Sequence, residues 1–219
     1  MGLRRRIATT FAASAAAAGL AVGLAAPATA LSEAETGQFL GKLTATYNDP
    51  TVSSDGNPYD FDIVTKAALV TGADKTLASL GSFTLFAPND RAFEVTANNL
   101  GLLGKNYKYS AKVDEGRVFN AIANSGVDVT EILLYHVIPN AKVTGKQVLS
   151  GPFTQRIDMA NQEKLRVTVL SRSPRFPVIV LGDKDGRVFN DLVVRPDVIS
   201  TENTVVHSVS DVLLPDLQN

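Results

Sequence analysis

The sequence predicts an α+β fold, with helices and strands segregated along the chain rather than alternating. Residues spaced for amphipathic helices fill the first half, whereas short runs of β-branched and aromatic residues fill the second half, from Val137 onward. Behind the N-terminal segment lie about 190 residues, enough to bury one self-sufficient core. Because no internal repeat is visible, we expect a single domain.

The first thirty residues have the layout of a secretory signal peptide. Basic residues 4–6 precede an alanine-rich apolar run at residues 7–26, and the small residues 28–30 offer a cleavage site before Leu31. An uncleaved membrane anchor is the alternative, because the run is nearly long enough to span a bilayer, although alanine is only weakly hydrophobic. We expect residues 1–30 to be the signal peptide of a secreted, extracellular or envelope-associated protein with no stable membrane insertion after cleavage. The arginines leave both the general secretory and the twin-arginine routes open.

Charge and cysteine content exclude several classes of function. The net charge is -1, and removal of the signal peptide with its three arginines leaves -4. Nucleic acid is not an expected partner, because its binding requires clustered basic residues and no basic stripe interleaved with aromatic residues is visible. The chain has no cysteine, which excludes disulfides, thiol nucleophiles and thiolate metal sites.

The first half predicts an N-terminal arm and then the helices of the main domain. Residues 31–47 predict a helix capped by Ser32, and the polar residues 48–58 predict a loop, so residues 31–60 form a helical arm and loop ahead of a domain at 61–219. Asp62 is expected to cap the next helix. Further helices or helical turns are predicted at 63–71, 77–80, after Asn89-Asp90, at 111–124 and at 129–136, with a strand at 83–86.

The second half predicts strands joined by turns. The expected strands are 148–149, 153–157, 165–170, 178–181, 187–189, 191–194, 198–200 and 205–214. Residues 182–186, with the sequence Gly-Asp-Lys-Asp-Gly, predict a hairpin turn. They resemble a calcium loop only in part, because a third ligand before the glycine and a closing glutamate are both missing.

No catalytic or metal-binding signature is apparent. The two histidines, His136 and His207, lie among apolar residues and are interpreted as core residues whose rings satisfy buried groups. The acidic pairs at 60/62 and 114/115 lie in polar surroundings and are interpreted as solvated faces and caps. Nucleotide-binding, zinc-protease and serine-hydrolase motifs are absent from the sequence. We therefore expect no enzyme activity, no cofactor and no metal.

Three segments together resemble the fasciclin-like domain. The first box is Thr-Leu-Phe-Ala-Pro-Asn-Asp-Arg-Ala-Phe at residues 84–93, and the last box is Val-Val-His-Ser-Val-Ser-Asp-Val-Leu-Leu-Pro at 205–215. Between them, Leu-Tyr-His-Val-Ile-Pro at 134–139 is similar to the Tyr-His motif of the family. From these boxes we assign structural roles to Phe86, Pro88, Asn89, Asp90, Phe93, His207, Asp211 and Pro215. The alanine-rich signal peptide suggests a bacterial member.

The resemblance implies a twisted β-sandwich or wedge with helices packed along one side. It also implies an extracellular adhesion or interaction module that binds a cell-surface or matrix protein or glycan without catalysis. Binding in animal members is linked to the Tyr-His region, which corresponds to Tyr135 and His136. The alternative is that both side chains are buried and only position the surface.

Residues 98–125 form a longer and more polar link than is usual in the family. Tyr107 and Tyr109, flanked by lysines, are candidate binding residues there, because tyrosine is favoured at interfaces. The alternative is a solvated insertion whose tyrosines fold back on the core. A carrier of an apolar pigment or lipid, a hydrolase assembled only in the fold, and a purely structural envelope component are rival functions. The sequence leaves the oligomeric state open.

Overall fold

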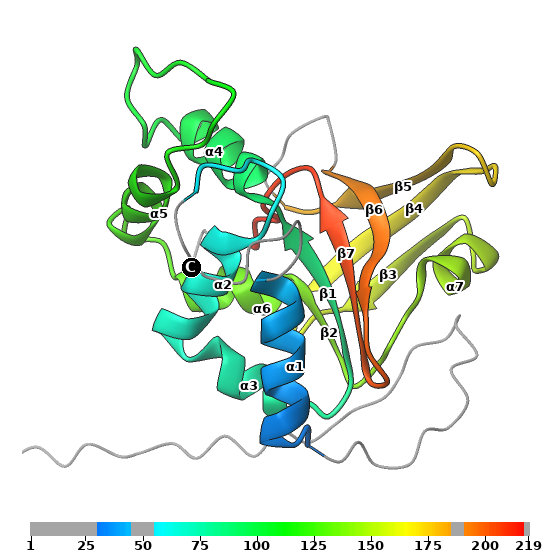
Figure 1. Ribbon diagram of the computed structural model, residues 1–219. Coiled ribbons are helices and arrows are strands. Elements are labelled where there is room, and N and C mark those ends of the chain that lie inside the picture. Colours follow the sequence, from blue (N-terminus) through cyan, green and yellow to red (C-terminus); the bar gives the residue numbers. More distant parts are fainter. Residues whose placement is uncertain (1–29, 45–54, 185–190, 217–219) are drawn as a thin grey trace, which may run out of the picture.

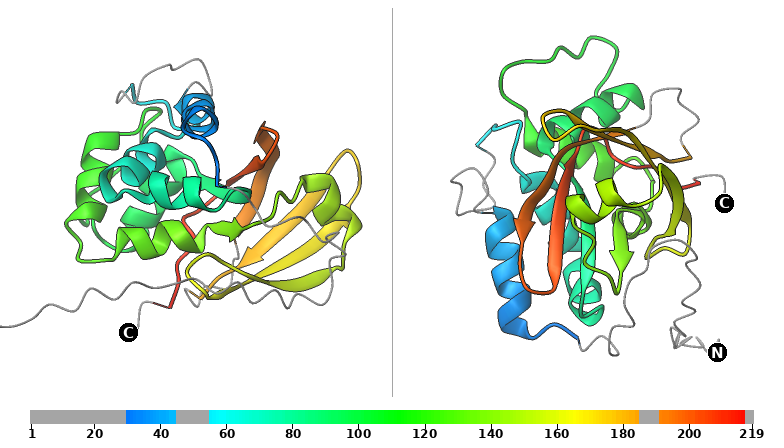
Figure 2. Two further views of the ribbon diagram at one scale, coloured as in Figure 1. Left: turned by 90° about the horizontal axis from the view of Figure 1, so that it is seen from below. Right: turned by 90° about the vertical axis from the view of Figure 1, so that its right-hand side faces the viewer.

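The computed structural model describes residues 30–44, 55–184 and 191–216, so the expected signal peptide lies outside the described residues except for its last position. The fold is α+β, as the sequence predicts. A layer of helices packs against one side of a seven-stranded mixed sheet that curls into a nearly closed wedge (Figures 1 and 2). Among the described helices, none is both long and apolar enough to cross a membrane.

The described residues form seven helices, six of them before residue 137 and one after it. The helices are α1 (Glu33–Thr44), α2 (Asp62–Thr71), α3 (Ala73–Ser79), α4 (Asp90–Asn99), α5 (Glu115–Ala123), α6 (Val129–Tyr135) and α7 (Gly145–Ser150). Residues 148–149, expected as a strand, belong to α7. That helix begins with a reciprocal capping box between Thr144 and Gln147, which outweighs the short β-rich run.

The strands form one sheet in the order β2-β1-β7-β6-β5-β4-β3. Their bounds are β1 (Phe83–Pro88), β2 (Val137–Pro139), β3 (Thr154–Asp158), β4 (Lys164–Arg172), β5 (Pro177–Gly182), β6 (Asp191–Ser200) and β7 (Thr204–Val209). Strands β1 and β7 pair in parallel, with Phe86 opposite His207, and the other pairs are antiparallel. The first and last motif boxes are therefore neighbouring strands. The expected strand at 187–189 and the end of the hairpin turn before it lie outside the described residues.

Strand β6 bends the sheet. Its pairing with β7 shifts register between Val193 and Arg195 and again between Arg195 and Ile199, and Asp197 has a φ of 54°. Such bulges add an unpaired residue and increase the local twist. The two short strands expected at 191–194 and 198–200 are thus one strand, which carries the chain from the β3–β5 part of the sheet into the β1–β7 part.

The sheet separates two hydrophobic cores. Helices α1 to α6 pack on β1 and β7 around Phe39, Phe83 and Val206, and the rings of Phe39 and Phe83 meet edge to face with centroids 5.1 Å apart. The second core fills the inside of the curled sheet, around Leu165 and Leu181. Because β1 and β7 are covered on both faces, all six residues of each are buried.

Candidate functional site

Tyr135 and His136, the residues that the Tyr-His motif marks for binding, are both buried. Tyr135 ends α6 with its side chain in the sheet core, and its hydroxyl donates to the Lys164 carbonyl oxygen at 3.4 Å. Burial raises the pKa of the Tyr135 hydroxyl above its ordinary range. The residue therefore fixes α6 against β4, and a role in direct binding stays a prediction.

His136 connects α6 to the C-terminal segment. Its Nδ1 donates to the Ile132 carbonyl oxygen at 2.8 Å, and its Nε2 accepts the Leu213 amide at 2.9 Å. The ring is 1% exposed, and burial lowers the pKa of His136 to about 4, so the imidazole is neutral. Both ring nitrogens are used within the fold, which leaves neither available as a catalytic base.

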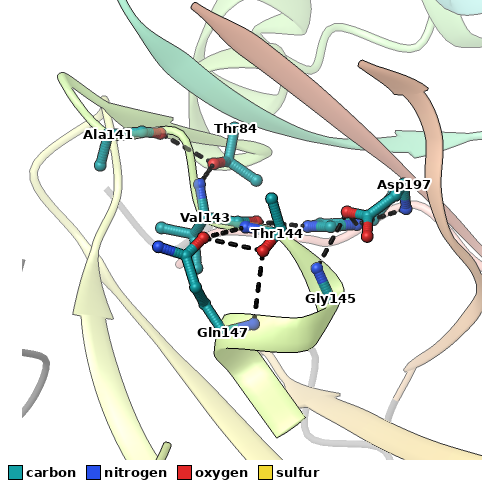
Figure 3. A network of polar contacts seen from close by, with 8 residues as sticks. Thr84, Ala141, Val143, Thr144, Gly145, Gln147 and Asp197 are labelled. Atoms are coloured by element: carbon teal, nitrogen blue, oxygen red, sulfur yellow. Dashed lines mark hydrogen bonds and ion pairs between the residues drawn. The ribbon is translucent and has the colours of Figure 1, made fainter. Parts of the chain in front are cut away.

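His207 lies on β7 at the centre of a second polar network, part of which Figure 3 shows. Its Nε2 donates to the Val143 carbonyl oxygen at 2.8 Å, and its Nδ1 accepts the Asp197 amide at 3.0 Å. The Asp197 carboxylate in turn accepts the amide of Gly145 at 2.9 Å. Burial lowers the pKa of His207 despite the nearby carboxylate. This network binds the start of α7 to the bulge of β6.

Thr84 extends the same network into β1 (Figure 3). Its hydroxyl donates to the Ala141 carbonyl oxygen and accepts the Val143 amide, each at 2.8 Å. The segment between β2 and α7 is thereby held on both sides, by β1 through Thr84 and by β7 through His207. The first and last boxes thus carry a scaffold of hydrogen bonds rather than an exposed site.

The remaining residues of the two boxes are also placed within the scaffold. Phe86 lies in the sheet core and Phe93 in the helical core, while Pro88 ends β1 and pairs with Val209. Asn89 caps α4 by accepting the Ala92 amide at 2.9 Å. In the last box, Asp211 is half-buried and Pro215 buried, directly after the chain leaves β7.

The tyrosines of residues 98–125 fold back on the helices instead of projecting freely. The Tyr107 hydroxyl donates to the wholly buried Glu94, which also accepts from Arg91. Burial and that bond raise the pKa of Tyr107 to about 12. Tyr109 remains 48% exposed, packs edge to face on Tyr107, and has its hydroxyl bonded to Asn98 at 3.0 Å. Of the two tyrosines, Tyr109 is therefore the one that a partner can reach.

Several carboxylates that the sequence analysis interprets as solvated or capping residues are buried in the structure. Asp60, Asp62 and Glu115, expected on solvated faces or as caps, are buried, and so is Asp90; only Asp114 of the two pairs is a cap, at the start of α5. One oxygen from each of Asp60, Asp90 and Glu115 lies within 4.8 Å of the others, where α2, α4 and α5 begin. The helix N-termini explain how the fold tolerates this concentration of acid, since their amides favour negative charge. Sequence reasoning missed the cluster because its members come from three separate segments.

Asp90 is the best defined member of this carboxylate cluster. Instead of capping its own helix, it accepts the Ile63 amide at the start of α2 at 3.0 Å through Oδ1. Asp62 therefore does not cap α2 as expected. Burial, reinforced by Asp60 and Glu115, raises the pKa of Asp90 well above its ordinary range. The cluster can share protons, and its spacing would also fit a hard cation such as Ca²⁺, whose oxygen ligands lie at about 2.3–2.6 Å.

Two small apolar cavities lie in the described part of the chain. One, of ≈ 20 Å³, lies between α1, α2 and α6 and is lined by Phe39, Leu43 and Leu133 among others. Another, of ≈ 10 Å³, lies inside the sheet. Each accommodates about one water molecule. Neither of these two cavities holds a pigment or lipid molecule at its present size.

Comparison with known proteins gives one family. The family model described as the fasciclin domain matches residues 60–215. No curated protein matches the sequence. Among solved structures, a FAS1 domain pair from the insect cell adhesion molecule fasciclin I is similar, with 17% sequence identity and a TM-score of 0.47. The match covers 70% of this chain and 43% of that chain, so the chain spans less than half of the domain pair.

Proposed function

The chain belongs to the fasciclin domain family, and from this premise we propose that it is a secreted adhesion or interaction module without catalytic activity. Its partner would be a protein or glycan of a cell surface or matrix. Domains of this family occur in extracellular proteins, and the layout of residues 1–30 supports export. The two histidines support the non-catalytic part of the proposal, because their ring nitrogens are occupied by hydrogen bonds within the fold.

The observation that carries the proposal is the half-exposed, rigidly held Tyr109. Its ring packs on Tyr107, and the Arg91 guanidinium lies 5.9 Å from the ring centroid. The Asn98 side-chain amide donates a hydrogen bond to its hydroxyl. Lys105 and Lys108 are exposed on the same loop. Tyrosine and arginine are the residues that most often dominate binding energy at interfaces, and a ring held in place loses little entropy on binding. We refer to Arg91, Asn98, Lys105, Lys108 and Tyr109 as the tyrosine surface.

A single substitution tests the proposal without disturbing the core. Tyr109→Ser should weaken saturable binding of the exported protein to its producer's isolated cell envelopes by about tenfold, as expected for a central aromatic contact. Val70→Ser, at a site 65% exposed near the end of α2, removes a similar exposed apolar side chain and should change nothing. Equal affinity of Tyr109→Ser and the natural protein, with unchanged melting temperature, would overturn the assignment of the tyrosine surface.

A further inference from the structure

A second exposed surface lies on strands β3 and β4 and on the hairpin that joins β4 to β5. We call it the arginine–aromatic surface; its members are Phe153, Arg156, Arg166, Leu170, Arg172, Arg175 and Phe176, all exposed. It lies away from α4 and the segment between α4 and α5, which carry the tyrosine surface: Figure 2 (left) shows the green helices and the yellow strands on opposite sides of the molecule. Nothing in the proposed function uses it.

The strand register places two arginines directly opposite each other. In the antiparallel β3–β4 pair, Arg156 faces Arg166, and both are exposed while Leu165 and Val167 point into the core. Like charges directly opposite on a sheet destabilise it. Among the described residues, neither guanidinium makes an ion pair, whereas the next pair on the same face, Lys164 with Asp158, does. The unfavourable pair would be relieved by an anion bound from outside.

Large apolar side chains are exposed beside these arginines. Phe153, Leu170 and Phe176 are 63%, 67% and 76% exposed. The backbone segments that carry them are adjacent, because the Val169 amide donates to the Phe153 carbonyl oxygen at 2.7 Å and the Ser171 hydroxyl to the Phe176 carbonyl oxygen at 2.8 Å. Leu170 faces outward because it continues the outward positions of Arg166 and Thr168 along β4, and it lies at the register shift between β4 and β5. Three such side chains together mark a contact surface rather than scattered exposure.

Arginine and aromatic groups are in direct contact at this end of the strands. The Arg172 guanidinium lies 3.9 Å from the centroid of the Phe153 ring and donates to the Gly151 carbonyl oxygen. Arg172 also pairs with Pro177 across the hairpin, next to Phe176. Arg166 lies four residues before Leu170, about 13 Å along an extended strand. The positive and apolar groups therefore lie along the same two strands, with Arg156, Arg166 and Leu170 at outward positions and Phe153 opposite Val169 at the strand end.

We infer that the arginine–aromatic surface binds an anionic lipid bilayer, with Arg156 and Arg166 at the headgroups and Phe153, Leu170 and Phe176 at the interface. A bilayer surface supplies both kinds of contact at once: negative headgroups for guanidinium groups and an interfacial layer that accepts aromatic rings. A hydrated anionic polysaccharide would satisfy the arginines but leave the apolar side chains in water. This chemistry favours lipid over a soluble polyanion.

The test uses the exported protein and two kinds of vesicle, one of phosphatidylcholine alone and one containing phosphatidylglycerol. The natural protein should sediment with the anionic vesicles at least about tenfold more tightly, and salt should weaken this binding. Replacing both Arg156 and Arg166 by Gln should weaken it by roughly twenty- to thirtyfold, since each basic residue near such a surface contributes about fivefold. Phe176→Ser should weaken it by about fivefold.

A matched control removes the same charge elsewhere. The control variant carries both Lys105→Gln and Lys108→Gln, which remove two positive charges from the tyrosine surface. It should leave vesicle binding unchanged. The lipid assignment is wrong if this control weakens binding as much as the arginine pair, or if anionic and neutral vesicles bind alike. It is also wrong if dextran sulfate binds as tightly as the vesicles and Phe176→Ser affects neither. Because the vesicles contain no protein or glycan, failure here leaves the proposed function untouched.

Discussion

At the scale of single residues, the two histidines show why a motif need not mark a contact site. Each ring uses one nitrogen as a donor and one as an acceptor, and each joins segments distant in the sequence: Ile132 with Leu213 for one, and Val143 with Asp197 for the other. A neutral imidazole meets both requirements without a counter-charge. The identity of these residues is explained by folding alone.

Acid should therefore destabilise the protein through His136. The pKa of this ring falls from 6.5 to about 4 on folding, so its stabilising effect is complete above pH 6.5 and is lost as the pH falls toward 4. The loss amounts to about 3 kcal/mol of unfolding free energy, at 1.36 kcal/mol for each pH unit. Urea titrations at pH 7 and pH 4 should show this loss of unfolding free energy, and the loss should be smaller in His136→Gln. An equal loss in that variant would refute the role of His136.

Asp90 should behave in the opposite way. Its pKa is raised on folding, so its contribution to stability is complete below its unfolded value of 3.8 and is lost as the pH rises above it. Asp90→Asn keeps the acceptor for Ile63 and turns an amide donor toward Asp60. Between pH 5 and pH 8, in buffer with chelator, the variant should gain at least about 1 kcal/mol relative to the natural protein. Asp158→Asn, a control at an exposed carboxylate, should show no such gain in stability. A stability difference between Asp90→Asn and the natural protein that does not change with pH would contradict this account.

At the scale of elements, the junction of α7 with the β6 bulge depends on a glycine. A Cβ added at Gly145 would lie 2.7 Å from the Pro196 Cβ and 3.3 Å from an Asp197 carboxylate oxygen. At this point the Asp197 carboxylate accepts the Gly145 amide, and the Asp197 amide donates to the His207 ring. The bulge and the helix start therefore form one rigid joint between the two parts of the sheet.

Gly145→Ala should consequently lower the unfolding free energy by about 1–3 kcal/mol, because backbone must shift to admit the methyl group. Gly116→Ala in α5 is the matched control: its Cβ would meet only an Asp114 oxygen at 3.9 Å, so it should stabilise by about 0.5–1 kcal/mol. Chemical denaturation of both variants measures the difference. Similar stability of the two would show that the joint is not tightly packed.

At the scale of the whole molecule, the sequence predicts the fold class and the family well, because both depend on local pattern. The β-rich run before Pro88 becomes β1 and Asn89 caps α4, whereas the strand expected at 205–214 ends at Val209. Contacts between distant segments are not local: the carboxylate cluster draws on residues 60, 90 and 115. The alternation of arginine with buried residues along β4 was a usable signal for the arginine–aromatic surface, since alternate residues of a strand share a face.

The two exposed surfaces give the molecule a consistent overall plan. The tyrosine surface lies on the helical side and the arginine–aromatic surface on the opposite strands (Figure 2). Taken together, the two proposals would have the molecule lie on an anionic membrane through one side and present the other to a partner. Neither surface requires the buried Tyr135 and His136 to move.

The most direct measurement of the central claim is a binding isotherm of the labelled, exported protein on intact cells of its producer, combined with solvent extraction of the purified protein. We predict saturable binding that an excess of unlabelled protein displaces, and an extract without a stoichiometric apolar molecule. Absence of saturable binding, together with a lipid or pigment recovered at one molecule per chain, would contradict the adhesion account and establish the carrier function instead.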